Sequence, residues 1–424
     1  MTLQSLVRYD PDASPHPRCV SKLRRSRTSY NRSKAPFTVD FSDNVARLEP
    51  SATLAITARA KAMQAEGRSV IDLSAGEPSF PTPGVAAAAA ARSVAEGKTG
   101  YPPTPGLREL REAAATYLNE TTCAAGADPQ NLMVSAGVKQ ALFNLAYCLF
   151  GSGDQVLVPA PYWPSYTTII HLTRATPVPV PLDWSDGFRV TAEALEAHRT
   201  RRTKGLLLNS PSNPSGAVMA REDLEGVLAW AGEHGIWVLS DEIYRRLHYG
   251  SGSATSVLDI ADRPTRIVAL DGMSKAFSMP GWRIGWGIGP SELITKACAL
   301  QSQTTSGAAS PSQYASAALL SSPQRESIVG EFRATLDRRR TLSLAALQAV
   351  PGIEVVDQPG AIYHYLRLTD GQDSMDVAEA LLTQAGVATI PGEAFGTPGY
   401  LRMTYAGADD PLAEGVRRIA GFFG

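Results

Sequence analysis

The 424-residue sequence contains few cysteines, few histidines and no long apolar run. The four cysteines, which show no Cys-x-x-Cys spacing, are Cys19, Cys123, Cys148 and Cys298. Scattered cysteines of this kind are typical of a reducing compartment and do not form a structural zinc site. The six histidines form no His-x-x-x-His pair, so we expect no metal. The longest alanine-rich stretch, 85–91, is too short to span a bilayer, so we expect no membrane partner.

An excess of charge of either sign is also missing. The chain has 40 Lys and Arg against 41 Asp and Glu, which gives a formal net charge of −1 at pH 7. Because proteins that bind nucleic acid carry a positive field, we expect no nucleic-acid partner. A hydrophobic content of 44% is ordinary for a globular enzyme, and the length allows two domains.

Residues 1–44 differ in composition from the rest of the chain. Between Arg18 and Lys34 there are seven basic residues and no acidic one. Without apolar periodicity, this stretch is predicted to be a disordered basic extension. An organelle transit peptide is the alternative, since such peptides are rich in Arg and Ser. Asp10, Asp12 and the lack of an amphipathic pattern favour the plain extension and a cytoplasmic protein.

The middle of the chain alternates between apolar runs and amphipathic helical patterns. Strands are predicted at 132–134, 156–158, 206–208, 236–239 and 267–270. Continuous apolar runs of this kind are typical of a mostly parallel sheet covered on both faces. Helices are predicted over 51–66, 85–96, from 107, and over 139–150 and 221–233.

After Gln313 the pattern changes to that of a smaller α+β domain. A long helical region, interpreted as one bent helix, is predicted over 324–350, followed by two more helices over 374–385 and 411–422. Short strands are predicted at 353–356, 361–368, 387–390 and 401–405. The chain therefore combines a large α/β domain with a second, smaller one.

Four chemically distinctive residues follow four of the predicted parallel strands. They are Trp163, Asn213, Asp241 and Lys275. Taken singly, each has an ordinary role in a core, a turn or a helix cap. In doubly wound sheets, however, ligands bind where the strands end, so four such residues at one edge favour a ligand site.

The residue types indicate which ligand this is. Lys275 is a potential nucleophilic amine, and Arg283, eight residues later, presents a guanidinium suited to phosphate. An amine that can form an imine beside a phosphate anchor is what pyridoxal phosphate requires. Asp241 can pair with a protonated pyridine nitrogen, and Tyr244, three residues later, can donate to the ring's phenolate oxygen. The adjacent Glu242 is not expected to share this site, because neighbouring side chains diverge.

Four motifs occur in order along the chain: Ala-Gly-Glu-Pro at 75–78, Asn-Pro-Ser-Gly at 213–216, Ser-Asp-Glu-Ile-Tyr at 240–244 and Ser-Lys…Gly-Trp-Arg-Ile-Gly at 274–285. With them the sequence resembles the aspartate-aminotransferase family of fold-type I pyridoxal-phosphate enzymes, in its gamma-type branch. The resemblance implies a large cofactor-binding α/β domain over 81–313 and a small α+β domain formed by 45–80 and 314–424. It also implies a homodimer.

The resemblance assigns roles to individual residues. Lys275, Asp241 and Tyr244 would be catalytic, with Lys275 holding the cofactor as a Schiff base. The cofactor-binding residues implied are Gly137, Val138 and Lys139 through their amides, Trp163 by stacking, and Asn213, Asp241, Tyr244, Ser274, Lys275 and Arg283. Tyr101 would reach the phosphate in the neighbouring subunit's site. The substrate-binding residues implied are Gly76, Trp163, Asn213 and Arg402, of which Arg402 would grip the α-carboxylate.

Two departures from the family pattern bear on the phosphate and the substrate. Many members carry a hydroxyl residue where this chain has Gly272, so one phosphate contact is not expected here. Aspartate-specific members need a cation for the distal carboxylate, yet 140–150 and 301–313 contain no Lys or Arg. An aromatic, neutral or unusual amino acid is therefore open as the substrate. His364 is interpreted either as a substrate contact or as strand packing.

The resemblance implies an aminotransferase that moves an amino group between an amino acid and a 2-oxo acid by a ping-pong mechanism. A lyase, cyclising or oxidising enzyme of amino-acid secondary metabolism would keep the same cofactor residues. A remoter alternative is the cofactor-binding effector domain of a transcription regulator, although residues 1–44 are too short for the winged helix it needs.

Overall fold

The computed structural model describes residues 40–46, 48, 52–123, 126–260 and 265–424. Its contacts define two units, Met1–Asp43 and Asn44–Gly424. In the first unit only residues 40–43 are described, and they are exposed. Most of the predicted extension, 1–44, and the first residue of the helix predicted over 51–66 therefore lie outside the described residues.

A seven-stranded sheet dominates the described part of the second unit, in the order β2-β8-β7-β6-β5-β3-β4. Its strands are β2 (Leu132–Ser135), β3 (Gln155–Ala160), β4 (Thr176–Pro181), β5 (Thr203–Asn209), β6 (Trp237–Asp241), β7 (Ile267–Gly272) and β8 (Gly285–Ile288). Within this sheet β8 pairs antiparallel with β2 and β7, and all other neighbouring strands pair in parallel. The mostly parallel sheet predicted from the apolar runs is confirmed, whereas β4 and β8 were not predicted.

Alternate residues of the strands pack into separate cores on the two faces of the sheet. Leu206 and Leu208 of β5 belong to the core that includes α3 (Arg108–Thr121), α7 (Arg221–Glu233) and α9 (Ser310–Leu320). Leu207, between them, belongs to the core that includes α4 (Val138–Leu149), α5 (Ser165–Leu172) and α8 (Ser291–Thr304). Since successive side chains of a strand point to opposite faces, helices cover the sheet on both sides. Two further helices, α2 (Gly84–Ala95) and α6 (Ala192–Glu196), pack on α9 and α7.

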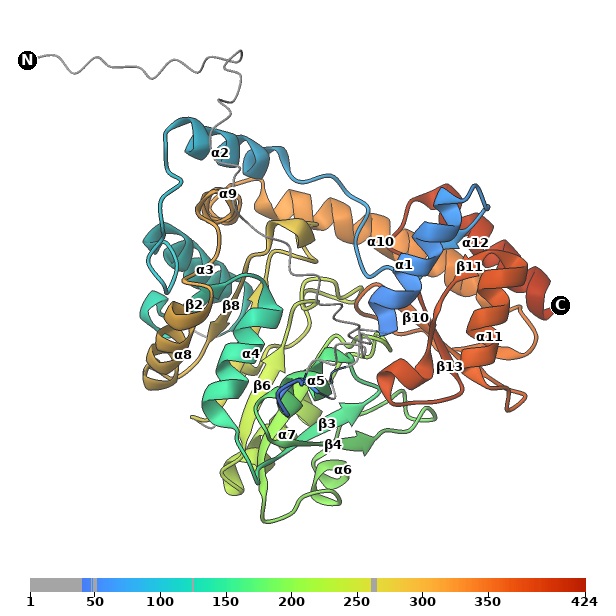
Figure 1. Ribbon diagram of the computed structural model, residues 1–424, viewed down its shortest axis with the longest axis horizontal. Helices are drawn as coiled ribbons and strands as arrows, with labels where there is room; N and C mark the ends of the chain where they lie inside the picture. Colours follow the sequence, from blue (N-terminus) through green and yellow to red (C-terminus); the bar gives the residue numbers. More distant parts are fainter. Residues whose placement is uncertain (1–39, 47, 49–51, 124–125, 261–264) are drawn as a thin grey trace, which may run out of the picture. The chain divides into compact units, whose positions relative to one another are not determined.

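The C-terminal region forms a four-stranded antiparallel sheet. Its order is β12 (Ile390–Pro391), β13 (Tyr400–Thr404), β10 (Tyr363–Leu368) and β9 (Ile353–Val355). Nearby, β1 (Ile71–Asp72) pairs in parallel with β11 (Val387–Ala388). The surrounding helices are α1 (Ala52–Ala65), α10 (Arg325–Leu347), α11 (Ser374–Ala380) and α12 (Asp409–Phe423). Figure 1 shows the blue helix α1 beside the red C-terminal elements, which α1 contacts through β11 and β12.

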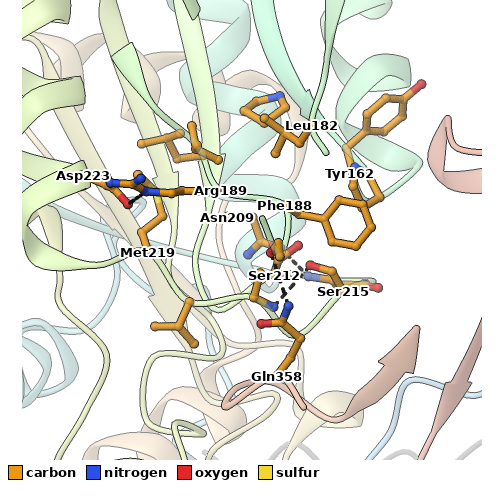
Figure 2. Close-up of a pocket in the computed structure, with 18 of the residues that line it drawn as sticks. Tyr162, Leu182, Phe188, Arg189, Asn209, Ser212, Ser215, Met219, Asp223 and Gln358 are labelled. Carbon is orange, nitrogen blue, oxygen red and sulfur yellow. Dashed lines mark hydrogen bonds and ion pairs between the residues drawn. The ribbon is translucent and has the colours of Figure 1, made fainter. Parts of the chain in front are cut away.

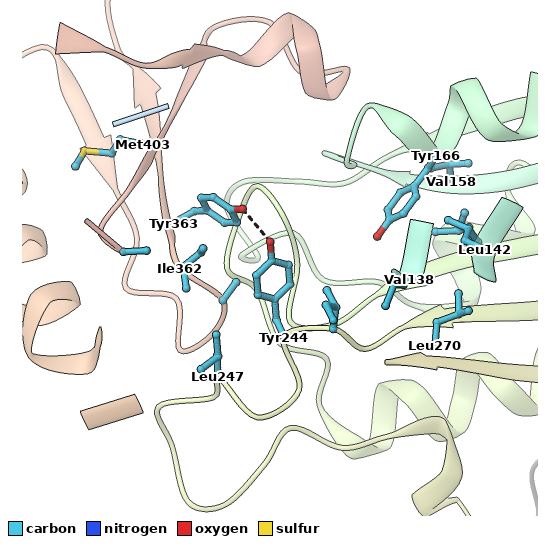
Figure 3. Packing of buried hydrophobic residues seen from close by; sticks show 14 of the residues in the cluster. Val138, Leu142, Val158, Tyr166, Tyr244, Leu247, Leu270, Ile362, Tyr363 and Met403 are labelled. Carbon is cyan, nitrogen blue, oxygen red and sulfur yellow. Dashed lines mark hydrogen bonds between the residues drawn. The ribbon is translucent and has the colours of Figure 1, made fainter. Parts of the chain in front are cut away.

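The two larger sheets share one core, and this positions the site between them. Tyr244 and Leu247, from the loop after β6, pack with Ile362, Tyr363 and Met403 of the C-terminal region (Figure 3). The carboxyl ends of β5, β6 and β7 therefore face β10 and β13. The exact domain boundaries proposed from the sequence stay a prediction. No helix within the described ranges has the length and hydropathy needed to cross a membrane.

Candidate active site

A cavity of about 420 Å³ lies at the carboxyl ends of the parallel strands. Its walls come from β5, β6 and β7, from the starts of α4 and α5, and from α1, β10 and β13. Among its described lining residues, the cations are Lys61, Lys139, Lys275, Arg283 and Arg402, and the acids are Glu77 and Asp241. Because five cations face two carboxylates, the cavity favours a ligand with several negative charges.

Lys275 and Asp241 line this same cavity. Lys275 follows β7 and is half-buried, with its Nζ donating to the carbonyl oxygen of Gly76 and lying 5.7 Å from the centre of the Tyr244 ring. Asp241 ends the adjacent parallel strand β6. Glu242 lies on the other side of the chain, where it accepts from Ser240 and Val257. The two neighbouring carboxylates therefore do not work as a pair.

The Asp241 carboxyl is buried and held from two sides. Tyr166 Oη donates to Asp241 Oδ2 over 2.8 Å, and the Ile243 amide donates to Oδ1 over 3.2 Å. Burial raises the pKa of Asp241 to about 6, against the opposing effects of these hydrogen bonds and the Lys275 charge. Asn209 Nδ2 also donates to the Asp241 carbonyl oxygen over 2.8 Å. A buried carboxylate of this kind suits a cationic partner from a ligand.

The start of α4 and the nearby Arg283 form a candidate binding site for an anion, called here the anion cradle. In the first turn of the helix, the amides of Val138 and Lys139 have no helical acceptor, and the helix dipole favours an anion there. The exposed Arg283 side chain lies beside Gly137, where an added Cβ would stand 2.5 Å from Arg283 Nη2. For Gly137 the structure differs from the expectation, because its amide donates to the Ser135 carbonyl over 2.8 Å. Its part is the left-handed turn, with φ at 85°.

Arg402 forms the opposite end of the cavity. The side chain is buried and donates to Asn213 Oδ1 over 2.9 Å and to the Ser74 carbonyl over 2.6 Å. Its Nε is a buried donor that has no acceptor among the described residues. Since an unmet buried donor is costly, this nitrogen points to an anionic ligand that completes the guanidinium's hydrogen bonds.

Four other residues predicted to bind the cofactor or the substrate belong to the same cavity. Gly76, Trp163, Tyr244 and Ser274 all line the cavity. The Trp163 ring meets Tyr166 edge-on, with the two centres 5.3 Å apart. Tyr244 is fully buried, and its hydroxyl lies 2.8 Å from that of Tyr363.

The Lys139 side chain also enters the cavity. The sequence predicts a role for its amide alone, and the segment 140–150, which contains no Lys or Arg, begins one residue later. Its Nζ lies over the Trp163 ring, 4.6 Å from the ring centre. Burial lowers the pKa of Lys139, and the charge of Arg283 lowers it further. An anion between the two cations would relieve both effects.

Three other positions considered in the sequence do not contribute a side chain to this cavity. Tyr101 is 96% exposed and is not part of this cavity. His364 points away from it, 2.8 Å from Ser343 Oγ, and burial lowers its pKa to about 3. Strand packing is therefore the interpretation of His364 that the structure supports. A side chain at Gly272 is excluded, because its Cβ would lie 2.7 Å from Gly285 Cα.

A second cavity of about 280 Å³ adjoins the first, and Figure 2 shows Asn209, Arg189 and Asp223 among its lining residues. Tyr166, Asn209 and Asn213 line both cavities. Inside it, Arg189 is paired with Asp223 at 2.6 Å, so its strongest charges are already neutralised. Asn209 fixes the backbone of Asn213 between the two cavities, because its Oδ1 accepts from the Asn213 amide over 2.8 Å.

The residues present fit pyridoxal phosphate. The anion cradle at α4 and Arg283 suit the phosphate, and the buried Asp241 suits a protonated ring nitrogen. Lys275 would provide the amine, and Arg402 Nε, which has no acceptor among the described residues, suits a substrate carboxylate. The fold and this combination of side chains are those of fold-type I pyridoxal-phosphate-dependent aminotransferases.

Comparison with known proteins agrees with this class. The chain belongs to the aminotransferase class I and II family, whose family model matches residues 68–419. It is 41% identical to the aspartate aminotransferase of Streptomyces avermitilis, over 89% of this chain and 95% of the relative. It is 38% identical to a probable aspartate/prephenate aminotransferase of Aquifex aeolicus, over 88% and 96% of the two chains.

The solved structures agree as well. The aspartate aminotransferase from Thermus thermophilus with maleate superposes with a TM-score of 0.87 at 36% identity, over 91% of this chain and 100% of the other. The protein is thus a pyridoxal-phosphate-dependent aminotransferase that acts on an amino acid and a 2-oxo acid. The fold class, the enzyme class and the cofactor expected from the sequence are confirmed.

Some residues of the cavity were not found from the sequence. Tyr166 follows Trp163 by three residues at the start of α5, a helical spacing that places both near one face. Successive side chains of β10 point to opposite faces of the sheet, so Tyr363 and its neighbour His364 lie on different faces. Both patterns were visible, but neither showed which face would meet the cofactor.

Proposed function

We propose that this aminotransferase takes a dicarboxylic amino acid, aspartate first of all, as its amino donor. The observation that carries the proposal is the Lys139 side chain over Trp163, inside a cavity where cations outnumber acids. The relatives named above are aspartate or aspartate/prephenate aminotransferases, and the similar Thermus protein is described with maleate, itself a dicarboxylate. These names support the same substrate class.

The charges of the cavity match the charges of the reactants. Arg283 and the α4 amides would hold the cofactor phosphate, Asp241 the ring nitrogen, and Asn213 and Tyr244 the ring oxygen. Arg402 would hold the substrate α-carboxylate with the nitrogen that has no acceptor now. Lys139, whose Nζ lies over the Trp163 ring at the edge of the cavity, would then be available for a second carboxylate.

The chemistry follows from this placement. When bound, pyridoxal phosphate supplies an aldehyde that bonds amines covalently and a ring that withdraws electrons from the substrate Cα. Asp241 keeps its negative charge next to the ring nitrogen, which maintains that withdrawal. Arg402 fixes the substrate by its carboxylate, with Asn213 and the Ser74 carbonyl holding the guanidinium in place. Lys275 Nζ, once free, takes the proton from the substrate Cα.

The test replaces Lys139 by methionine and compares aspartate with alanine as donors. Loss of a charge-assisted hydrogen bond of about 1.5–3 kcal/mol lowers kcat/KM for aspartate roughly 10- to 150-fold. Alanine, which has no distal carboxylate, is expected to change little. Lys61→Met is the matched control, since it removes one lysine from α1 at the same cavity. An unchanged ratio of the two substrates in Lys139→Met would contradict the proposal and restore the neutral or aromatic alternative.

We also propose that the enzyme works as a homodimer. Tyr101 is almost fully exposed and lies outside its own chain's cavity, which supports its predicted role in the neighbouring subunit's site. Mixing the two inactive proteins Lys275→Ala and Tyr101→Ala tests this, because one site of each hybrid dimer keeps both native residues. Random mixing should then restore about a quarter of the native activity, and no recovery would count against the shared site. A cytoplasmic location stays a prediction.

A further inference from the structure

Tyr363 lines the active-site cavity and contacts both Tyr244 and Arg402. It is buried on β10, and its hydroxyl lies 2.8 Å from the hydroxyl of Tyr244 (Figure 3). Its ring lies under the Arg402 guanidinium, 4.4 Å from ring centre to Cζ. An added Cβ at Gly76 would stand 2.5 Å from the Tyr363 hydroxyl. One side chain therefore touches the tyrosine, the arginine and the glycine proposed to contact cofactor and substrate.

The direction of the hydrogen bond between the two tyrosines follows from their proton count. Each hydroxyl has one proton to donate and can accept as well. If Tyr244 donates to the ring oxygen of the cofactor, its proton is used there. Tyr363 must then be the donor in the pair. Donation to Tyr244 polarises its hydroxyl and strengthens the bond it makes in turn.

We propose that Tyr363 is a positioning residue that orients the Tyr244 hydroxyl toward the cofactor and holds the Arg402 guanidinium against its ring. This inference rests on the proposed role of Tyr244. The hydroxyl of Tyr363 contacts Tyr244, which is proposed to bind the cofactor, and its ring contacts Arg402, which is proposed to bind the substrate carboxylate. Substitutions that remove the hydroxyl alone or the whole ring can therefore test the two contacts separately.

Tyr365 offers a matched control on the same strand. It lies two residues further along β10 and has the same 3% exposure as Tyr363. Its hydroxyl bonds to Thr397 instead, and its ring stacks on Tyr400 with the centres 4.9 Å apart. Tyr365→Phe thus removes an equally buried hydroxyl that does not face the cavity.

The experiment follows the visible absorbance of the bound cofactor in the resting holoenzyme as a function of pH. A hydrogen bond to the ring oxygen stabilises the deprotonated chromophore, so weakening that bond raises the midpoint pH of the absorbance titration. Tyr363→Phe is expected to raise this midpoint by about half a pH unit to one pH unit, and Tyr365→Phe to leave it unchanged. The KM for the amino donor should stay within about twofold in Tyr363→Phe, where the ring remains, and should rise further in Tyr363→Leu.

A double substitution decides whether Tyr363 acts through Tyr244. In a Tyr244→Phe background, Tyr363→Phe should add no further shift. A full additional shift there, or no shift from Tyr363→Phe alone while Tyr244→Phe does shift the midpoint, overturns the inference. An unchanged midpoint in Tyr244→Phe instead removes the role of Tyr244 itself. If circular dichroism shows that Tyr363→Phe has lost its fold, the hydroxyl is structural and the inference is also wrong.

Discussion

The hydrogen bond from Tyr166 to Asp241 sets the charge of the carboxylate proposed to bind the cofactor's ring nitrogen. Burial raises the pKa of the Tyr166 phenol far above its usual value, so this group stays protonated and donates at all working pH values. Its bond to Asp241 Oδ2, 2.8 Å long, favours the ionised carboxylate. Tyr166→Phe removes only this hydroxyl from a buried side chain.

The expected size of the effect follows from the bond. A buried hydrogen bond to a charged group contributes about 1.5–3 kcal/mol, which corresponds to roughly one to two pKa units. The pKa of Asp241, at about 6 in the native protein, is therefore expected to rise by that amount in Tyr166→Phe. At pH 7 the native carboxyl is mostly ionised, whereas the variant's would be half or more protonated.

Binding of pyridoxal phosphate to the apoprotein, measured by fluorescence between pH 5 and 9, reports this change. Affinity should fall as the pH drops through about 6 in the native protein and through about 7–8 in Tyr166→Phe. Tyr162→Phe is the control, because Tyr162 lines the second cavity and not the first. Identical pH profiles for the native protein and Tyr166→Phe would refute the reasoning.

Two further predictions concern backbone packing and buried charge. An alanine Cβ at Gly285 would overlap the Val138 amide nitrogen at the start of α4. Gly285→Ala should therefore weaken the binding of pyridoxal phosphate to the apoprotein at least tenfold. Gly281→Ala is the control, because nothing lies within 4 Å of a Cβ added there. Asp271 is buried beside Arg245, and burial raises its pKa to about 7. Between about pH 4 and 7 the folded state therefore holds a proton that the unfolded state has lost, and stability falls as the pH rises. Urea unfolding should show Asp271→Asn gaining stability over the native protein between pH 5 and 8, and a constant difference would contradict this.

The fold was predictable where local patterns matched their final surroundings. Arg221–Glu233 forms α7 as predicted, because its apolar residues recur at helical spacing and face one core. The strand β4 was missed, since its prolines alternate along Thr176–Pro181 and interrupt any apolar run. Such a strand is possible only at a sheet edge, and β4 is the edge strand next to β3.

The candidate site was predictable in its strand-end residues and not in its supports. Asp241 and Lys275 each follow a buried strand, and parallel strands bring their carboxyl ends to one edge. Tyr166 and Tyr363 carry no local mark of function, because their roles depend on the partners they meet at 2.8 Å, 75 and 119 residues away in the chain. The Lys139 side chain was overlooked for the same reason, since its position over Trp163 depends on a contact with a distant part of the chain.

The sequence by itself determined the alternation of strands and helices and the family, and it singled out Lys275 as the predicted reactive amine. Periodicity and motif spacing are local properties, and they survive without knowledge of the fold. Only the tertiary structure decided that five cations share one cavity, that Arg402 keeps a donor free, and that Tyr363 links Arg402 to Tyr244. These facts arise where β10 and β13 meet the ends of the parallel strands, and contacts between such distant segments depend on packing.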